Sequence, residues 1–227
     1  MIIITGASRG IGKFLFESYL GIGAESVIGT YHTTTPEKNV LSFRELDVSN
    51  YENVEIVVNG LGLDSEQLTL INCAGINYNS FMHKSEPEKW KQVIETNLFG
   101  SYNMIRSLLP HMRENKFGRI INFASVVAVK PTLGVSSYAA SKSSLWGLSK
   151  SIAAENAKYN VTINNINMGY SELGMIKDVP DEYLKILIEQ IPAGRLCEPA
   201  DIFQTVEYLR TTSYINGSSI DLSGGLV

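Results

Sequence analysis

The sequence predicts an α/β fold: a doubly wound parallel sheet of seven strands with helices on both faces. Short β-branched segments alternate along the chain with longer segments of helical period. Strands and helices in this order form a parallel sheet, because each helix returns the chain to the start of the next strand. The chain has 227 residues and shows no internal repeat, low-complexity tract or Pro/Gly-rich linker. We therefore expect one domain over residues 1–227.

The individual elements follow from composition and periodicity. Seven segments have the short, β-branched character of buried strands: Ile2–Thr5, Glu25–Thr30, Val40–Leu46, Leu68–Cys73, Gly118–Ser125, Val161–Asn167 and Ser218–Leu222. Six segments have helical periodicity: Ile11–Leu20, Tyr51–Gly60, Glu86–Arg113, Ser136–Tyr159, Asp181–Gln190 and Pro199–Arg210. The polar segment 32–39 contains Pro36 and is too short for a helix, so we expect an abbreviated crossover there.

Composition and charge exclude several classes of protein. Hydrophobic residues make up 44% of the chain and charged residues 19%, which is typical of a globular domain. The formal net charge of −4 provides no electrostatic footprint for nucleic acid, so we expect no such partner. No apolar run approaches the roughly 18 residues that span a bilayer, and no basic amphipathic stretch predicts surface binding. We therefore expect no membrane partner.

The cysteines and the first residues bear on location. Cys73 and Cys197 stand far apart and in no C-x-x-C pair, so the sequence predicts neither a disulfide framework nor a metal site. The chain enters a strand at once, without the pattern of a signal peptide. The expected location is the cytoplasm.

A glycine-rich turn follows the first strand. Residues Thr5–Gly12 read Thr-Gly-Ala-Ser-Arg-Gly-Ile-Gly and precede an amphipathic helix. Glycines here allow a tight turn and close approach of the backbone to a pyrophosphate, and the helix N-terminus offers unpaired N–H groups. The spacing Gly-x3-Gly-x-Gly differs from the generic Gly-x-Gly-x-x-Gly pattern. The context favours a dinucleotide cradle over the alternative, a glycine-rich turn that binds no ligand.

The choice between the two nicotinamide dinucleotides follows from charge. NAD-binding proteins place a carboxylate near the end of the second strand for the ribose 2′-hydroxyl. Here the residues around Tyr31 include no carboxylate between Glu25 and Glu37. A 2′-phosphate would meet no repulsion, and Arg9 could pair with it. We expect NADP(H), with Arg9 at the 2′-phosphate; the alternative for Arg9 is a solvated surface residue.

Four polar residues form a candidate catalytic set. Tyr138 and Lys142 are spaced i, i+4 on a predicted helix and share one face, so the ammonium could lower the pKa of the phenol for general acid–base work. Ser125 ends a buried strand, at the edge where parallel sheets bind ligands. Asn97 falls on the apolar seam of a long helix. The alternatives are a surface pair, a turn-capping serine and a hydrogen-bonded core amide.

Together these residues resemble the short-chain dehydrogenase/reductase family over the whole chain. The matching positions are Thr5–Gly12, Asp47, Val48, Asn72–Gly75, Asn97, Ser125, Tyr138–Lys142, Asn164, Gly169, Asn216, Gly217 and Ser223–Gly225. The resemblance implies a Rossmann-like sheet of strand order 3-2-1-4-5-6-7. It also implies an oxidoreductase that interconverts a ketone and a secondary alcohol, and the charge argument above makes NADP(H) its expected cofactor.

The resemblance assigns roles to residues. Asn97, Ser125, Tyr138 and Lys142 become the catalytic set: Tyr138 protonates the ketone oxygen, Ser125 steadies it, Lys142 holds ribose hydroxyls, and Asn97 anchors a water that returns the proton through Lys142. Asp47 and Val48 border the adenine. The expected cofactor-binding residues are Gly6, Ser8, Arg9, Gly10, Ile11, Gly12, Tyr31, Asp47, Val48, Asn72, Ala74, Gly75, Tyr138, Lys142 and Gly169.

The chain departs from the family after the sixth strand. The usual Pro-Gly is Met168-Gly169 here, and Leu173 stands where the family has a threonine that touches the cofactor. We therefore expect a rearranged contact on the nicotinamide side. Ser171–Arg195 corresponds to the family's lid over the cleft, although an amphipathic helix packed on the body is an equal alternative for most of its side chains.

Substrate class rests on finer resemblance. Gln190–Leu196 and Glu198–Ile202 are similar to the same stretch of 3-oxoacyl-acyl-carrier-protein reductases, so we expect a small or carrier-bound ketone, first of all a 3-oxoacyl thioester. A basic docking patch could come from Lys84, Lys89, Arg106, Arg113, Lys116 and Arg119. A reductase of a sugar or secondary-metabolite ketone, and a non-catalytic NADP-binding sensor or scaffold, are the alternatives.

The resemblance also implies a homo-oligomer, a tetramer or a dimer. The predicted helix Ser136–Tyr159 carries small residues that permit close helix packing: Ala139, Ala140, Ser143, Gly147 and Ala154. Two-fold pairing of such faces is the expected arrangement.

Overall fold

A computed structural model describes residues 1–227 except 25, 64–66, 131, 175 and 177–179. It contains one parallel sheet of seven strands in the order β3-β2-β1-β4-β5-β6-β7, which confirms the predicted fold. The strands are β1 (Ile2–Thr5), β2 (Val27–Tyr31), β3 (Phe43–Glu45), β4 (Thr69–Asn72), β5 (Gly118–Ser125), β6 (Val161–Met168) and β7 (Ser219–Leu222).

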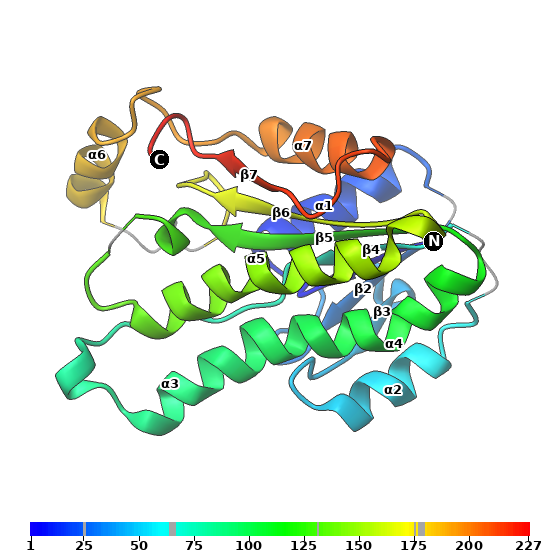
Figure 1. The fold of residues 1–227 in the computed structure, drawn as a ribbon. Helices are drawn as coiled ribbons and strands as arrows, with labels where there is room; N and C mark the ends of the chain where they lie inside the picture. The colour runs from blue at the N-terminus through cyan, green and yellow to red at the C-terminus, as the bar shows by residue number, and fades with distance from the viewer. Residues whose placement is uncertain (25, 64–66, 131, 175, 177–179) are drawn as a thin grey trace.

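Helices cover both faces of this sheet (Figure 1). The helices α1 (Gly10–Gly21) and α7 (Pro199–Thr211) lie on one face. On the other lie α2 (Tyr51–Asn59), α3 (Pro87–Ile94), α4 (Gly100–Glu114) and α5 (Ser136–Asn156). The helix α6 (Asp181–Glu189) stands beyond the C-terminal ends of β5 and β6, where loops from several strands also meet.

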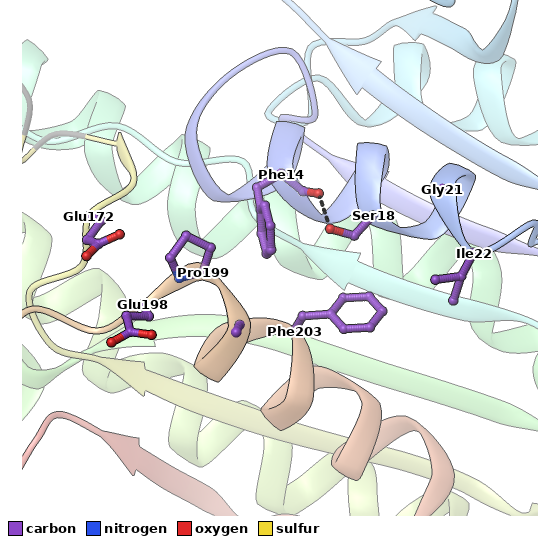
Figure 2. A pocket seen from close by; sticks show the side chains of 9 residues that line it. Phe14, Ser18, Gly21, Ile22, Glu172, Glu198, Pro199 and Phe203 are labelled. Carbon is purple, nitrogen blue, oxygen red and sulfur yellow. Dashed lines mark hydrogen bonds between the residues drawn. The ribbon is translucent and has the colours of Figure 1, made fainter.

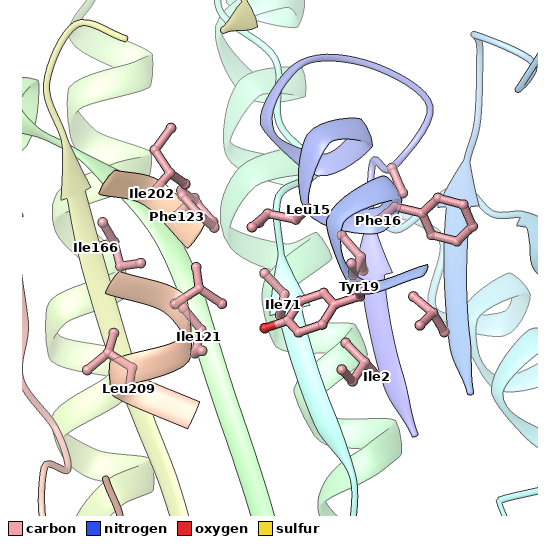
Figure 3. Close-up of a cluster of buried hydrophobic side chains, with 14 of the residues drawn as sticks. Ile2, Leu15, Phe16, Tyr19, Ile71, Ile121, Phe123, Ile166, Ile202 and Leu209 are labelled. Atoms are coloured by element: carbon pink, nitrogen blue, oxygen red, sulfur yellow. The ribbon is translucent and has the colours of Figure 1, made fainter. Parts of the chain in front are cut away.

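Two apolar clusters hold the layers together. Ile4 of β1 and Ile71 of β4 pack with Leu15 and Phe16 of α1 on one face, in the cluster drawn in Figure 3. Ile3 of β1 faces the opposite way and packs with residues of α2 and α4. Alternate side chains of a central strand are thus buried on both faces, as a doubly wound sheet requires. The packing fixes the C-terminal edge of the sheet as a rigid platform.

The third strand is shorter than predicted. The sequence predicts a strand from Val40 to Leu46, whereas Val40–Ser42 forms a 3-10 turn and only Phe43–Glu45 pairs with β2. Asn39 begins that turn in the left-handed conformation, with a φ of 55°. Leu41 is 94% exposed. The prediction was wrong here because it took the apolar side chain of Leu41 as a sign of a buried strand.

The long helix predicted over Glu86–Arg113 is divided into three parts. Between α3 and α4 the residues Glu95–Phe99 form a π-helical turn. Wide turns of this kind occur inside α-helices and are frequent at functional sites. The predicted helix Ser136–Tyr159 likewise ends at Asn156, and Ala157–Tyr159 forms a 3-10 turn that stops at a left-handed Asn160.

Candidate active site

The turn between β1 and α1 has two positions where only glycine fits. Gly6 has a φ of 63°, and a Cβ there would lie 2.9 Å from the Cα of Ala74. A Cβ on Gly12 would lie 2.4 Å from the carbonyl oxygen of Gly6. The hydroxyl oxygen of Thr5 accepts hydrogen bonds from the N–H groups of Cys73 and Ala74, at 3.1 and 3.0 Å. The predicted cradle residues after β1 and β4 therefore lie side by side.

The N-terminus of α1 faces this turn. Arg9 is its N-cap, its side chain is exposed, and no side chain caps the helix. The N–H of Lys13 donates to the carbonyl of Arg9 at 3.1 Å, which leaves the first amides of the helix without intrahelical acceptors. A Cβ on Gly10 would lie 3.4 Å from the Cα of Gly174, so the start of the predicted lid lies against this N-terminus. Residues 175 and 177–179 of that lid lie outside the described residues.

The predicted adenosine side of the cleft lies at the ends of β2 and β3. Tyr31 ends β2, and its register partner on β3 is Glu45, whose side chain is exposed. A carboxylate at this position was not predicted from the sequence. The carboxylate of Asp47 accepts hydrogen bonds from the N–H and hydroxyl of Ser49, at 2.9 and 2.7 Å. Val48 is buried against the first residue of α4.

Two predicted cofactor residues have contacts within the sheet. The Nδ2 of Asn72 donates to Oδ1 of Asn122 at 2.9 Å, and its own Oδ1 is buried with no partner among the described residues. Asn122 in turn donates to Oδ1 of Asn165 at 3.2 Å, so amides on three neighbouring strands form a chain beneath α5. A Cβ on Gly169 would lie 2.9 Å from the Cα of Ser223, so this glycine lets the chain after β7 approach β6.

The two residues that depart from the family pattern after β6 both pack against the apolar core. Met168 ends β6 and is 7% exposed, within the cluster on the α1 face. Leu173 packs against the same cluster. The hydroxyl of Ser171 donates to the carbonyl oxygen of Leu173 at 3.0 Å. Leu173 thus anchors the segment after β6 to the body of the protein.

Ser125 and Tyr138 bring their hydroxyl groups together. Ser125 is the last residue of β5, and Tyr138 lies in the first turn of α5. Burial raises the pKa of Tyr138, and a hydrogen bond with Ser125 opposes this with a smaller lowering. The net direction differs from the sequence expectation, in which Lys142 lowers the pKa of the phenol. A raised pKa keeps the phenol protonated, as a proton donor must be.

Lys142 lies beneath this pair. Its Nζ donates to the carbonyl oxygen of Phe123 at 2.6 Å and lies 5.6 Å from the centre of the Tyr138 ring. The side chain is buried, and burial lowers its pKa to about 8. An amine with this pKa exchanges a proton readily near neutral pH, since the ideal pKa for proton transfer lies near the working pH.

Asn97 stands in the π-helical turn and is 1% exposed. Its Oδ1 accepts from the N–H of Ile76 at 2.8 Å, and its Nδ2 donates to the carbonyl oxygen of Ile76 at 3.0 Å. A Cβ on Gly75 would lie 3.2 Å from this Oδ1 and 3.6 Å from Nζ of Lys142. The structure therefore brings Gly75, Asn97 and Lys142 together at one place.

A separate hollow of about 750 Å³ opens between α1 and α7 (Figure 2). Phe14 of α1 and Phe203 of α7 form its apolar walls, with Glu172 and Glu198 toward one end. None of the predicted catalytic residues lines it. Among the described residues, no helix is long and apolar enough to cross a membrane.

The strand order and the glycine turn define a doubly wound protein of the dinucleotide-binding class. A family model described as short chain dehydrogenase matches residues 1–184, and the chain belongs to this family, as the sequence resemblance predicted. It is therefore an oxidoreductase of a family that acts on alcohol and carbonyl groups.

Relatives of known name cover nearly the whole chain. The 3-oxoacyl-[acyl-carrier-protein] reductase of Vibrio cholerae serotype O1 is 34% identical, over 99% of this chain and 96% of the relative. The acetoacetyl-CoA reductase of Shinella zoogloeoides is 35% identical, over 98% and 96%. Among solved structures, the ligand-free aldohexose dehydrogenase of Thermoplasma acidophilum superposes with a TM-score of 0.90 at 26% identity, over 99% of this chain and 92% of that one.

Proposed function

We propose that this protein is an NADP(H)-dependent oxidoreductase that reduces the ketone of a 3-oxoacyl thioester to a secondary alcohol. The observation that carries the proposal is the convergence of Ser125, Tyr138 and Lys142 at the C-terminal edge of the sheet, where parallel sheets bind ligands. The names of the two curated relatives, which describe reductases of 3-oxoacyl and acetoacetyl thioesters, support the substrate class.

The first turn fits a dinucleotide. The close approach at Gly6 and Gly12 leaves no side chain between the backbone and a pyrophosphate, and the uncapped N-terminus of α1 offers amides and a favourable dipole to it. When bound, the nicotinamide supplies a hydride to the ketone carbon. Gly6, Ser8, Gly10, Ile11, Gly12, Ala74 and Gly75 are the residues proposed to hold the cofactor at this turn.

The catalytic residues then manage the ketone oxygen and its proton. Ser125 donates a hydrogen bond to that oxygen, and Tyr138, whose raised pKa keeps it protonated, donates the proton. Lys142 holds the ribose hydroxyls and passes a proton to the tyrosine oxygen. Asn97 anchors the water from which Lys142 is reprotonated, because its Oδ1 and the lysine Nζ face the same place beside Gly75.

Charge supports NADP(H) over NAD(H). Arg9 is exposed at the first turn. The small hollow beside it is lined by Lys13 and Lys38 but also by Glu17 and Glu37, and Nζ of Lys13 lies 3.8 Å from the carboxylate of Glu37, so the charges around the hollow balance. Arg9 is therefore the cation that favours a 2′-phosphate. Glu45 opposes this choice, because it lies in register with Tyr31. We propose that Arg9 outweighs it, since Arg9 belongs to the phosphate-binding turn itself.

The predicted basic docking patch is smaller in the structure. Arg119 is 4% exposed, and its guanidinium donates to the carbonyl oxygens of Arg210, Gly118 and Asn160. Arg113 stacks on Tyr159, with its guanidinium carbon 4.0 Å from the ring centre. Both guanidinium groups thus make contacts within the protein, so neither adds to the expected basic docking patch. The proposal therefore concerns the reduction of the thioester ketone, and it does not use a surface patch that docks a carrier protein.

A substrate screen tests the proposal. Purified protein with NADPH should reduce acetoacetyl-CoA, and the loss of NADPH absorbance gives the rate. Oxidation of aldohexoses without reduction of acetoacetyl-CoA would favour a sugar dehydrogenase instead, a candidate supported by the superposition on the aldohexose dehydrogenase. Tight NADPH binding without turnover of any ketone or sugar would favour a sensor or scaffold.

We also propose a cytoplasmic homo-oligomer, a dimer or a tetramer. A Cβ added to Gly147 on α5 would have nothing within 4 Å, and Phe99 and Tyr102 are 51% and 44% exposed. Gly147, Phe99 at the end of the π-helical turn and Tyr102 in the first turn of α4 leave space and apolar surface for a second copy of the chain. Size-exclusion chromatography at micromolar concentration should give more than one chain per particle, and elution at 25.0 kDa would contradict the proposal.

A further inference from the structure

Ser141 lies at the junction of the two elements that carry the proposed proton path. It stands on α5 directly before Lys142 and is completely buried. Its Oγ accepts a hydrogen bond from Nδ2 of Asn97 at 3.0 Å and donates one to the carbonyl oxygen of Tyr138 at 2.8 Å. The family resemblance gave this residue no role, and the four-residue catalytic set does not include it.

The direction of these bonds fixes the orientation of the Asn97 amide. A serine hydroxyl has one proton, and Ser141 donates it to the carbonyl of Tyr138. The hydroxyl can therefore only accept from Asn97, so the amide nitrogen must face Ser141. The two bonds to Ile76 require the same orientation. Both protons of Nδ2 are thus engaged, and Oδ1 is directed to the side where Lys142 Nζ also lies, beside Gly75.

Among the described residues, the hydrogen bond that Asn97 donates to Ser141 is also the one that joins this amide to α5. Ile76 holds Asn97 to the loop after β4, and the π-helical turn holds it between α3 and α4. Without Ser141, the amide would keep its loop contacts but lose its side-chain connection to the helix that carries Tyr138 and Lys142. Buried catalytic groups need such supporting bonds, because small displacements of a proton path cost large factors in rate.

We propose that Ser141 is a positioning residue, which holds the Asn97 amide oxygen beside Lys142 and so maintains the proton supply to Tyr138. This inference rests on the proposed function, because it assigns Ser141 a part in the same reaction. The titratable groups around the lysine are Tyr138 on α5 and Cys73 after β4. An amide oxygen that faces an ammonium favours its charged form. Loss of the positioning should therefore shift the lysine toward its neutral form.

The first experiment measures steady-state reduction of acetoacetyl-CoA by Ser141→Ala. Loss of one buried hydrogen bond should lower kcat about fivefold to tenfold, while KM and the NADPH dissociation constant stay unchanged. The decline of kcat at alkaline pH should begin at lower pH than in the wild type. Ser18→Ala is the matched control, since the hydroxyl of Ser18 on α1 likewise donates to a carbonyl of its own helix, that of Phe14 at 2.8 Å, but outside the proposed site.

A double-mutant cycle separates positioning from a merely structural role. In an Asn97→Ala background, Ser141→Ala should have no further effect on kcat, because Ser141 acts through the amide. An equal further loss in that background, or an unchanged kcat and pH profile in the single variant, would overturn the proposal. Ser141→Thr keeps the hydroxyl and should recover kcat relative to Ser141→Ala; thermal unfolding of each variant identifies any that is simply destabilised.

A second measurement does not depend on turnover. The side-chain NH2 protons of Asn97 should exchange slowly with solvent in the wild type and in Ser18→Ala, and faster in Ser141→Ala, by NMR with Asn97→Ala as the assignment control. Unchanged exchange in Ser141→Ala would show that the serine does not hold the amide. If the wild type reduces no ketone, the proposed function fails and so does the catalytic part of this inference, whereas the exchange rates still decide whether Ser141 positions Asn97.

Discussion

Gly12 offers the sharpest test of the cofactor cradle. In Gly12→Ala the new Cβ would lie 2.4 Å from the carbonyl oxygen of Gly6. Unstrained contacts of this kind begin near 3.4 Å, so the first turn must move by about 1 Å away from α1, and a buried backbone cannot absorb such a shift without distortion. The N–H groups that face the pyrophosphate belong to this turn. We expect the NADPH dissociation constant to rise at least about tenfold, which corresponds to about 1.4 kcal/mol.

Gly21→Ala is the matched control, at the other end of the same helix. A Cβ on Gly21 would have nothing within 4 Å. Alanine there should leave NADPH binding unchanged and raise the free energy of unfolding by up to about 1 kcal/mol, because glycine weakens helices. Fluorescence titration with NADPH and chemical denaturation measure the two quantities. An unchanged NADPH dissociation constant in Gly12→Ala would refute the assignment of this turn to the cofactor.

Three further outcomes are expected. Tyr138→Phe should keep NADPH binding but lose roughly two to four decades of kcat, the usual worth of a general acid; near-normal turnover would remove the tyrosine from the reaction. Arg9→Ala should raise the dissociation constant of NADPH much more than that of NADH, and parallel changes in a titration of both would count against a contact with the 2′-phosphate. The rate of ketone reduction should fall as the pH rises through about 8, because burial lowers the pKa of Lys142 to about 8 and the neutral amine no longer supplies a proton; a kcat that is flat across this range would contradict the role of the lysine.

The sheet was predictable because its order follows from simple alternation. β1 and β5 have the predicted bounds, since both are buried along their whole length. The start of β3 was predicted wrongly, because Val40 and Leu41 are apolar in sequence but belong to an exposed 3-10 turn. The local sequence pattern does not show whether a neighbouring segment of the chain covers a given side chain.

The candidate site shows the same limit. The spacing of Tyr138 and Lys142 and the strand end at Ser125 predicted that these residues meet, and the structure brings them together. The net direction of the tyrosine pKa was not predictable, because it depends on burial by residues far away in sequence. The contact between Ser141 on α5 and Asn97 in the π-helical turn joins residues that are 44 positions apart. Its only signal in the sequence is that Ser141 lies inside the tyrosine–lysine motif.

Transfer of a deuteride to acetoacetyl-CoA from NADPH that carries deuterium at both C4 positions tests the proposed reaction most directly. Mass spectrometry of the product should find one deuterium at the new alcohol carbon with the wild-type protein, and almost none with Tyr138→Phe under the same conditions. Bound NADPH that retains its label in the presence of every ketone offered would contradict a reductase function for this site.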